Sequence, residues 1–257
     1  LMAVSLAATR ALETEFGVRI ADAAYVAGHS LGEYSALAAA GALSITDAAK
    51  LLRARGDAMQ AAVPVGQGAM AALIGKVDLA TAEAIAQEGA KTDVVVVAND
   101  NNVGNVVISG TVAGIDAAIA AAKEKGVRAI PLSVSAPFHS PLMQPAAEAM
   151  QAALASATIT APSAPVIANV TASPVSDPEQ IRKLLVEQIT ARVRWRESIE
   201  WLGGEGQEQG RIERFVETGA GKQLSGMIKR IVSGANTTAL NTPADLEAYA
   251  ASLKEGA

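Results

Sequence analysis

The chain has 257 residues, half of them apolar, so it can bury the core of one large domain or of a domain with an insertion. Its formal net charge of −5 argues against broad nucleic-acid binding. The absence of cysteine excludes disulfides, thiolate metal sites and a cysteine nucleophile, and no apolar run approaches the ~18 to 20 residues of a membrane span.

The first part of the chain alternates helical and strand patterns. We expect a helix up to about Phe16, a short strand near Tyr25, a helix from Leu31 and a helix over residues 46–62. Such alternation is typical of an α/β fold, in which helices connect the strands of a parallel sheet.

The pattern changes between residues 67 and 134. The order β-α-β-β-α-β predicts a ferredoxin-like unit, and an Asn/Asp/Gly-rich stretch, NDNNVG at 99–104, predicts the turn between its central strands. We therefore expect a small subdomain, 67–134, inserted into a larger domain formed by 1–66 and 135–257. The predicted strands are 69–74, 94–98, 105–109 and 128–134, and the predicted helices are 79–88 and 112–125.

The last part returns to an α/β pattern. We predict a basic turn at 192–196, and the charge-rich stretch 203–210 indicates a solvated loop or a helix end. The predicted helices here are 141–154, 178–189 and 222–232, and the predicted strands are 166–170 and 214–217.

A serine lies between two glycines in AYVAGHSLGEY, residues 24–34. The pattern Gly28-x-Ser30-x-Gly32, between a β-prone run and a helical one, is typical of a nucleophile elbow, a sharp strand-to-helix turn that exposes a serine hydroxyl. The motif is short and made of common residues, so an ordinary glycine-rich turn remains the alternative.

A serine nucleophile usually needs a base within hydrogen-bond reach. The chain has two histidines, and His29 adjoins Ser30 in a turn where neighbouring side chains diverge. By elimination the candidate base is His139, which follows a β-prone segment. The alternative is a histidine satisfied within the core.

An arginine interrupts the apolar face of the helix predicted at 46–62. Arg55 is spaced three residues after Leu52 and four before Met59, whereas Arg53 lies off this face. An arginine on a core face must find an anion or several acceptors. It is either one half of a structural salt bridge or a receptor that binds a substrate carboxylate bidentately.

With these residues the chain resembles the malonyl-CoA:acyl carrier protein transacylases of fatty acid synthesis and the related acyltransferase domains of polyketide synthases. The resemblance covers nearly the whole chain in the family's order. It implies a hydrolase-like α/β domain carrying a ferredoxin-like insertion. The matching segments are GHSLGEYSAL (28–37), RG (55–56), MQ (59–60), GAMAA (68–72), VISG (107–110), APFHS (136–140), NV (169–170), ETGAGK (217–222) and ALN (239–241).

The resemblance assigns roles to the catalytic residues. It implies that Ser30 forms the acyl-enzyme ester and that His139 is the general base and acid. The Leu31 backbone N–H then supplies one half of the oxyanion hole. A backbone carbonyl, placed by the resemblance at Arg194, orients the histidine in place of an aspartate.

The resemblance also assigns the substrate site. It implies that Arg55 pairs with the malonyl carboxylate, that Phe138 disfavours a branched α-carbon, and that His29 lies at the substrate-binding site. The implied reaction is ping-pong transfer from malonyl-CoA to the phosphopantetheine thiol of holo-acyl carrier protein in the cytoplasm. It implies no cofactor and no metal, and neither nucleic acid nor membrane as a partner.

The resemblance implies that the family begins with a strand and a Gly-Gln-Gly-Ser-Gln loop that supplies a second oxyanion N–H, and residues 1–257 do not include this segment. We expect that a molecule without this segment is a poor and fragile enzyme. Two alternatives stay open: an α/β-hydrolase-type esterase or thioesterase, which shares the Gly-x-Ser-x-Gly pattern, and a non-catalytic remnant. For the acidic carrier, the sequence offers a candidate basic patch: Arg192, Arg196, Lys222, Lys229 and Arg230.

Overall fold

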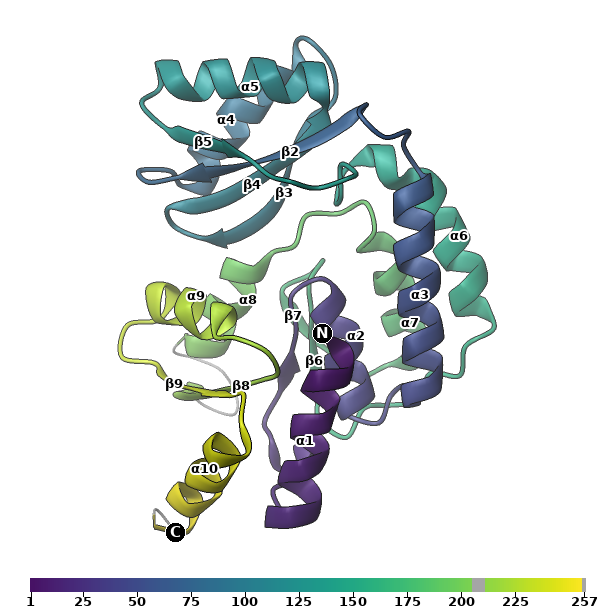
Figure 1. Cartoon of the computed structure of the whole chain (residues 1–257), viewed down its shortest axis with the longest axis vertical. Helices are drawn as coiled ribbons and strands as arrows, with labels where there is room; N and C mark the ends of the chain where they lie inside the picture. Colours follow the sequence, from purple (N-terminus) through teal and green to yellow (C-terminus); the bar gives the residue numbers. More distant parts are fainter. Residues whose placement is uncertain (205–210, 256–257) are drawn as a thin grey trace.

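The computed structural model describes residues 1–204 and 211–255. The predicted charge-rich loop at 203–210 therefore lies largely outside the described residues. Figure 1 shows a small sheet with two helices above a larger assembly of helices and short strands. No helix among the described residues is long and apolar enough to cross a membrane.

The amino-terminal part confirms the predicted alternation of helix and strand. Helix α3 begins at Ser44, whose Oγ accepts a hydrogen bond from the Asp47 N–H and so caps the helix. Gly17 ends α1 in the left-handed conformation, which glycine adopts without strain. The elements of this part are α1 (Met2–Phe16), a 3₁₀ turn (Ile20–Asp22), β1 (Val26–Ala27), α2 (Leu31–Ala39) and α3 (Ile45–Ala61).

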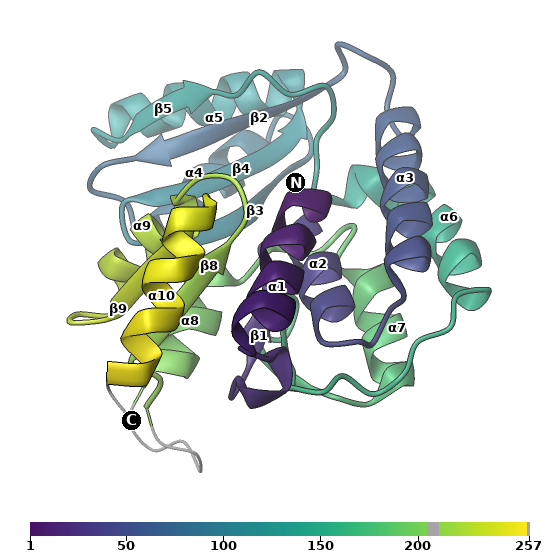
Figure 2. The ribbon, with the colours of Figure 1, turned by 60° about the horizontal axis from the view of Figure 1, so that its bottom comes forward.

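The segment from Gly68 to Pro131 forms a four-stranded antiparallel sheet in the order β3-β4-β2-β5. Helices α4 and α5 lie side by side against one face of this sheet (Figures 1 and 2), which confirms the ferredoxin-like order. The division of the chain at residues 67 and 134 stays a prediction. The elements are β2 (Gly68–Ile74), α4 (Leu79–Ala90), β3 (Val95–Asn102), β4 (Asn105–Thr111), α5 (Val112–Glu124) and β5 (Arg128–Pro131).

The predicted hairpin turn at 99–104 was too long. Strand β3 continues to Asn102, because its end pairs with β4 on one side and with the segment around Val193 on the other. The Asp100 N–H donates to the Val193 carbonyl, and the Asp100 carboxylate pairs with Arg196 at 2.8 Å. Long-range pairing therefore overrides the turn preference of these residues.

The carboxy-terminal part contains more regular structure than the sequence predicted. Strand β6 pairs parallel with β1 and antiparallel with β7, and β8 pairs parallel with β9. The predicted basic turn is wrong in its second half, because Trp195 begins α8. The elements are a 3₁₀ turn (Pro141–Met143), α6 (Gln144–Ala155), β6 (Val166–Ala168), β7 (Ser173–Val175), α7 (Pro178–Glu187), α8 (Trp195–Gly203), β8 (Arg214–Thr218), α9 (Gln223–Ile231), β9 (Asn236–Leu240) and α10 (Pro243–Glu255).

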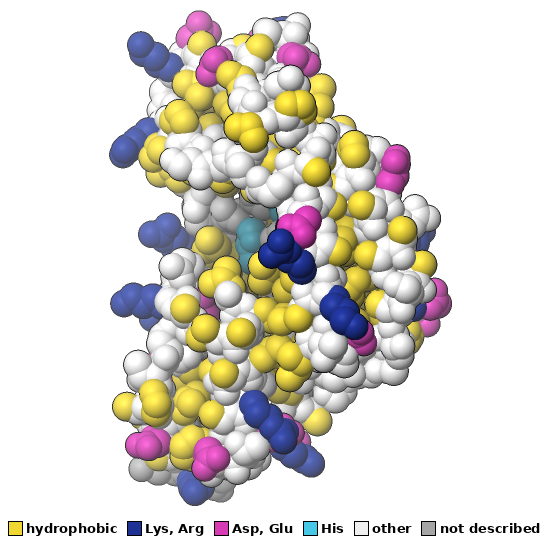
Figure 3. Space-filling view, turned by 45° about the vertical axis from the view of Figure 1, so that its right-hand side comes forward, with side chains coloured by type: hydrophobic (Ala, Val, Ile, Leu, Met, Phe, Trp, Pro, Cys, Tyr) yellow, Lys and Arg dark blue, Asp and Glu magenta, His cyan; other side chains and the backbone are white. Residues whose placement is uncertain are grey.

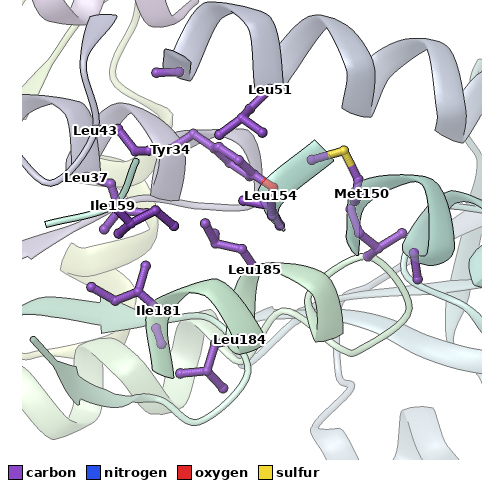
Figure 4. Packing of buried hydrophobic residues seen from close by; sticks show 14 of the residues in the cluster. Tyr34, Leu37, Leu43, Leu51, Met150, Leu154, Ile159, Ile181, Leu184 and Leu185 are labelled. Carbon is purple, nitrogen blue, oxygen red and sulfur yellow. The ribbon is translucent and has the colours of Figure 1, made fainter. Parts of the chain in front are cut away.

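The main core lies between α2, α3, α6 and α7. Figure 4 shows side chains from these helices, from the turn between α2 and α3 and from the loop after α6 directed toward one another. Burial of such side chains fixes the positions of the helices that carry the candidate site. The labelled members are Tyr34, Leu37, Leu43, Leu51, Met150, Leu154, Ile159, Ile181, Leu184 and Leu185.

Candidate active site

The turn between β1 and α2 has the geometry of a nucleophile elbow. Ser30 has φ 50° and ψ −106°, a strained combination for a residue with a side chain. A Cβ on Gly28 would lie 2.0 Å from the backbone of Gly32, so only glycine fits at the first motif position. The elbow predicted from the motif is confirmed.

His139 contacts the serine from the loop between β5 and α6. Its Nε2 lies 2.8 Å from the Ser30 Oγ, and its Nδ1 lies 2.9 Å from the Gln188 carbonyl oxygen. Because a carbonyl only accepts, Nδ1 must carry the proton. The Nε2 lone pair therefore faces the serine hydroxyl, as a general base requires.

The residue that orients the histidine was predicted wrongly. The carbonyl that accepts from His139 belongs to Gln188, at the end of α7, and not to Arg194. Arg194 is the residue before α8, and its carbonyl accepts instead from the Ser198 N–H at 3.0 Å and the Ser198 Oγ at 2.8 Å. That carbonyl points along its own helix and is already used there.

Arg55 reaches the serine from α3. Its Nη2 donates to the Ser30 Oγ at 2.9 Å and to the Gln188 Oε1 at 3.1 Å, and the guanidinium carbon lies 5.9 Å from the centroid of the Tyr34 ring. The residue is 7% exposed, and its Nε is buried with no hydrogen-bond partner in the described chain. Arg55 forms no ion pair with any carboxylate of residues 1–204 and 211–255, which contradicts a structural salt bridge.

The buried side-chain amide of Asn169 holds the backbone of the elbow in place. The Asn169 Oδ1 accepts from the Ser30 N–H at 2.7 Å, and the Asn169 Nδ2 donates to the Gly28 carbonyl at 2.8 Å. Asn169 immediately follows β6, the strand that pairs with β1. Backbone groups of a strained turn that lack a helical or strand partner are satisfied in this way.

A cavity of about 350 Å³ opens beside these residues. In Figure 3 a histidine side chain is visible in a hollow between the upper and lower parts of the surface. Leu31 lies at the start of α2, where the first N–H groups of a helix have no partner within the helix. The cavity is lined by His29, Ser30, Arg55, Gly56, Met59, Gln60, Met70, Asn99, Leu132, Val134, Phe138 and His139.

His29 is directed away from the nucleophile, as predicted for its place in the turn. Its Nε2 lies 2.8 Å from the Asn101 Oδ1, and its ring is tilted against the ring of Trp195 at 5.7 Å between centroids. Burial lowers the pKa of His29, which favours a neutral ring at the cavity wall.

Two site residues were missed in the sequence. Gln188 follows Leu184 by four residues and Leu185 by three, so it falls on the buried face of α7. Glu33 is likewise a polar residue on the buried face of α2. The signal that singled out Arg55, a polar side chain on an apolar helical face, was present at both positions.

Burial, followed by the charge of Arg55, lowers the pKa of His139 from 6.5 to about 3. The unfolded chain therefore binds a proton below pH 6.5 that the folded protein binds only near pH 3, so stability falls as the pH decreases through this window. Between about pH 7.5 and about pH 5.5, we expect the wild type to lose about 1 kcal/mol more unfolding free energy than His139→Gln.

Chemical denaturation of both proteins at the two pH values measures this difference. The pKa of Glu33 is raised to about 7, so its contribution has the opposite sign: it is complete below 4.5 and lost as the pH rises toward 7. Glu33 is present in both proteins, so its effect is subtracted. Equal losses in the two proteins would mean that the folded His139 titrates near its ordinary value.

An elbow serine, a buried histidine and a buried arginine around one cavity form an arrangement that suits an acyltransferase. The family model for the acyl transferase domain matches residues 1–212. The malonyl CoA-acyl carrier protein transacylase of Bacillus subtilis is 45% identical over 236 residues, which cover 90% of this chain and 72% of that protein. The chain belongs to the malonyl CoA-acyl carrier protein transacylase family.

Solved structures agree with this membership. The acyl-carrier-protein S-malonyltransferase of Bartonella henselae is 49% identical, with a TM-score of 0.93, and the match covers 98% of this chain and 79% of that one. A malonyl-transacylase in complex with a type II polyketide synthase acyl carrier protein is 38% identical, with a TM-score of 0.91 over 98% of this chain and 79% of that one. The predicted fold class, hydrolase-like with a ferredoxin-like insertion, is confirmed. The prediction that the protein is an acyltransferase is confirmed as well.

Proposed function

We propose that this protein transfers the malonyl group from malonyl-CoA to the phosphopantetheine thiol of an acyl carrier protein, through an ester on Ser30. The observation that carries the proposal is that the Ser30 Oγ contacts both the His139 Nε2, at 2.8 Å, and the Arg55 Nη2, at 2.9 Å. A base and a cation at one hydroxyl suit an acyl group that bears its own carboxylate.

In the first half-reaction, the Ser30 Oγ attacks the thioester carbonyl of malonyl-CoA while the His139 Nε2 takes the hydroxyl proton. The tetrahedral oxyanion is stabilised by the Leu31 N–H, at the positive end of the α2 dipole. When the carbon–sulfur bond breaks, His139 returns the proton to the sulfur of coenzyme A. The hydrogen bond from Nδ1 to the Gln188 carbonyl holds the ring in the required tautomer throughout.

The second half-reaction reverses these steps with another thiol. The carrier's phosphopantetheine thiol gives its proton to the His139 Nε2, and its sulfur attacks the ester carbonyl. The carbon–oxygen bond to Ser30 breaks, and the Ser30 oxygen regains the proton from His139. The malonyl thioester of the carrier leaves, and the free enzyme is restored. We propose that the protein acts in the cytoplasm, where it would meet both malonyl-CoA and the carrier.

The proposed selectivity for malonyl depends on Arg55 and Phe138. Arg55 is placed to receive the distal carboxylate in a bidentate fork. Phe138 is half-buried at the cavity wall immediately before His139, where its ring narrows the space beside the α-carbon of the acyl group and so excludes branched acyl chains. His29 lines the same cavity and completes the proposed substrate-binding residues.

The test is incubation with malonyl-CoA followed by intact mass measurement. We expect one malonyl adduct, located on Ser30 by peptide mapping, and its transfer to added holo-carrier. Turnover of simple esters without a malonyl adduct would support an esterase, and the absence of both reactions would support a non-catalytic remnant.

The carrier surface gives a separate prediction. Arg192 pairs with Glu83 and Arg196 with Asp100, so the candidate patch reduces to exposed basic residues on and before α9: Lys222, Lys229 and Arg230. For Lys229→Glu/Arg230→Glu we expect a several-fold higher KM for the acidic carrier, and an effect that weakens with added salt. Acylation of Ser30 by malonyl-CoA is the internal control. An unchanged KM for the carrier would exclude this surface.

A further inference from the structure

A buried carboxyl group lies one helical turn from the nucleophile and has no part in the proposed chemistry. Glu33 is in the first turn of α2 and only 3% exposed. Its Oε2 accepts from the Gln188 Nε2 at 2.8 Å and from the Asn169 N–H at 3.1 Å. Because two donors bind the same buried oxygen, the Glu33 carboxyl group is held in a fixed position by hydrogen bonds.

The carboxyl group is costly to bury. Desolvation raises the pKa of Glu33 to about 7, even though the hydrogen bonds from Gln188 and Asn169 and the charge of Arg55 act in the opposite direction. An apolar side chain would fill this core position without that cost. The cost indicates that the contacts of Glu33 hold another group in place.

The principal partner of Glu33 is the side-chain amide of Gln188. Its Nε2 donates to Glu33 and, at 3.1 Å, to the carbonyl of Ser30, while its Oε1 accepts from the Arg55 Nη2 at 3.1 Å. An amide has one accepting end and one donating end. Acceptors on the Nε2 side therefore turn the Oε1 toward the guanidinium.

We propose that Glu33 is a positioning residue that acts through the Gln188 amide to hold Arg55 in the orientation that receives the malonyl carboxylate. The inference rests on the proposed function, because it concerns how Arg55 selects its acyl group. Without Glu33, the Nε2 of Gln188 loses its shortest acceptor and keeps only the Ser30 carbonyl at 3.1 Å and the Asn169 Oδ1 at 3.5 Å. The amide then rotates more freely, and its Oε1 no longer fixes the Arg55 Nη2.

This arrangement predicts a specific defect. Loss of Glu33 should impair acylation by malonyl-CoA more than acylation by acetyl-CoA, because only the malonyl group carries a carboxylate for Arg55 to bind, whereas the hydrogen bond from Arg55 to the Ser30 Oγ serves both acyl groups. A merely structural role in the elbow would slow both acylations equally, because both use Ser30 and His139. The ratio of the two rate constants therefore separates positioning of Arg55 from general damage.

The experiment measures single-turnover acylation of Ser30 by malonyl-CoA and by acetyl-CoA, using quenched mass spectrometry. For Glu33→Ala we expect the malonyl-to-acetyl ratio to fall by about tenfold or more, the scale of one lost hydrogen bond to a charged group. Glu33→Gln keeps an acceptor oxygen for both donors, so it should retain a ratio near that of the wild type. If Glu33→Ala does not fold, Glu33→Asp carries the test, since its shorter side chain withdraws the acceptor from Gln188.

Leu37→Val is the matched control. Leu37 is fully buried on the same helix, one turn further on, and belongs to the main core. This substitution should lower the melting temperature and leave the malonyl-to-acetyl ratio unchanged. An unchanged ratio in the folded Glu33→Ala variant, or in Glu33→Asp where it replaces that variant, would overturn the proposal. Failure of the wild type to form a malonyl adduct would instead overturn the proposed function, so the two failures are distinguishable.

Discussion

Ser30→Ala is expected to abolish both the malonyl adduct and malonyl transfer. Removing the Oγ removes the atom that forms the ester, and the geometry brings no other hydroxyl to the His139 Nε2 within the described residues. Losses of a catalytic nucleophile in serine enzymes are on the order of 10⁴- to 10⁶-fold in rate. Intact mass after incubation with malonyl-CoA measures the adduct, and a coupled assay with holo-carrier measures transfer.

The matched control is Ser35→Ala, which removes a hydroxyl from the same helix but not from the elbow. Its adduct and transfer rate should match those of the wild type. His139→Ala should still permit slow acylation, with both half-reactions reduced about 10²- to 10⁴-fold, because general acid–base catalysis is lost and the nucleophile is kept. An adduct that persists in Ser30→Ala would contradict the assignment of the nucleophile.

The strand and helix pattern between residues 68 and 131 could be predicted because the relevant forces are local. Side chains alternate along its strands and recur at helical spacing along α4 and α5, and the sheet follows from that order. The carboxy-terminal part was harder. The start of helix α8 was included in the basic turn predicted at 192–196, because the arginines there mark a charged segment. The buried face of α8, which includes Trp195 and Ile199, instead packs in a core with residues of β6, β8 and α9, which are distant in the sequence.

Individual side chains of the site could be predicted where the chemistry limits the choice. Ser30 stands in a motif, His139 is one of two histidines, and Arg55 interrupts an apolar face. The carbonyl that orients His139 could not be found in this way, because every residue has a carbonyl and only the fold decides which one faces the ring. The end of α7 brings the Gln188 carbonyl to the His139 ring, whereas the Arg194 carbonyl accepts hydrogen bonds within α8.

Arg55→Ala is expected to change which acyl group the enzyme accepts. In the wild type, an acetyl group leaves the buried guanidinium without an anion, whereas a malonyl group pairs with it. Breaking a buried ion pair costs about 3–5 kcal/mol, and about 1.4 kcal/mol corresponds to a factor of ten. The wild type should therefore prefer malonyl by a factor on the order of a hundred to a few thousand. Arg55→Ala should lose most of this preference and gain relative activity on neutral acyl groups.

The control lies two residues away on the same helix. Arg53 is exposed and pairs with Asp57, so Arg53→Ala removes an equal charge without touching the cavity and should keep the malonyl preference. Arg55→Lys should also be impaired, because an ammonium cannot form the bidentate fork. The rate constants for acylation of Ser30 by malonyl-CoA and acetyl-CoA give the ratio for each variant. If Arg55→Ala and Arg53→Ala keep the same ratio, the arginine supports the serine and helix packing but does not select the substrate. The uncompensated Nε of Arg55 would then need another explanation.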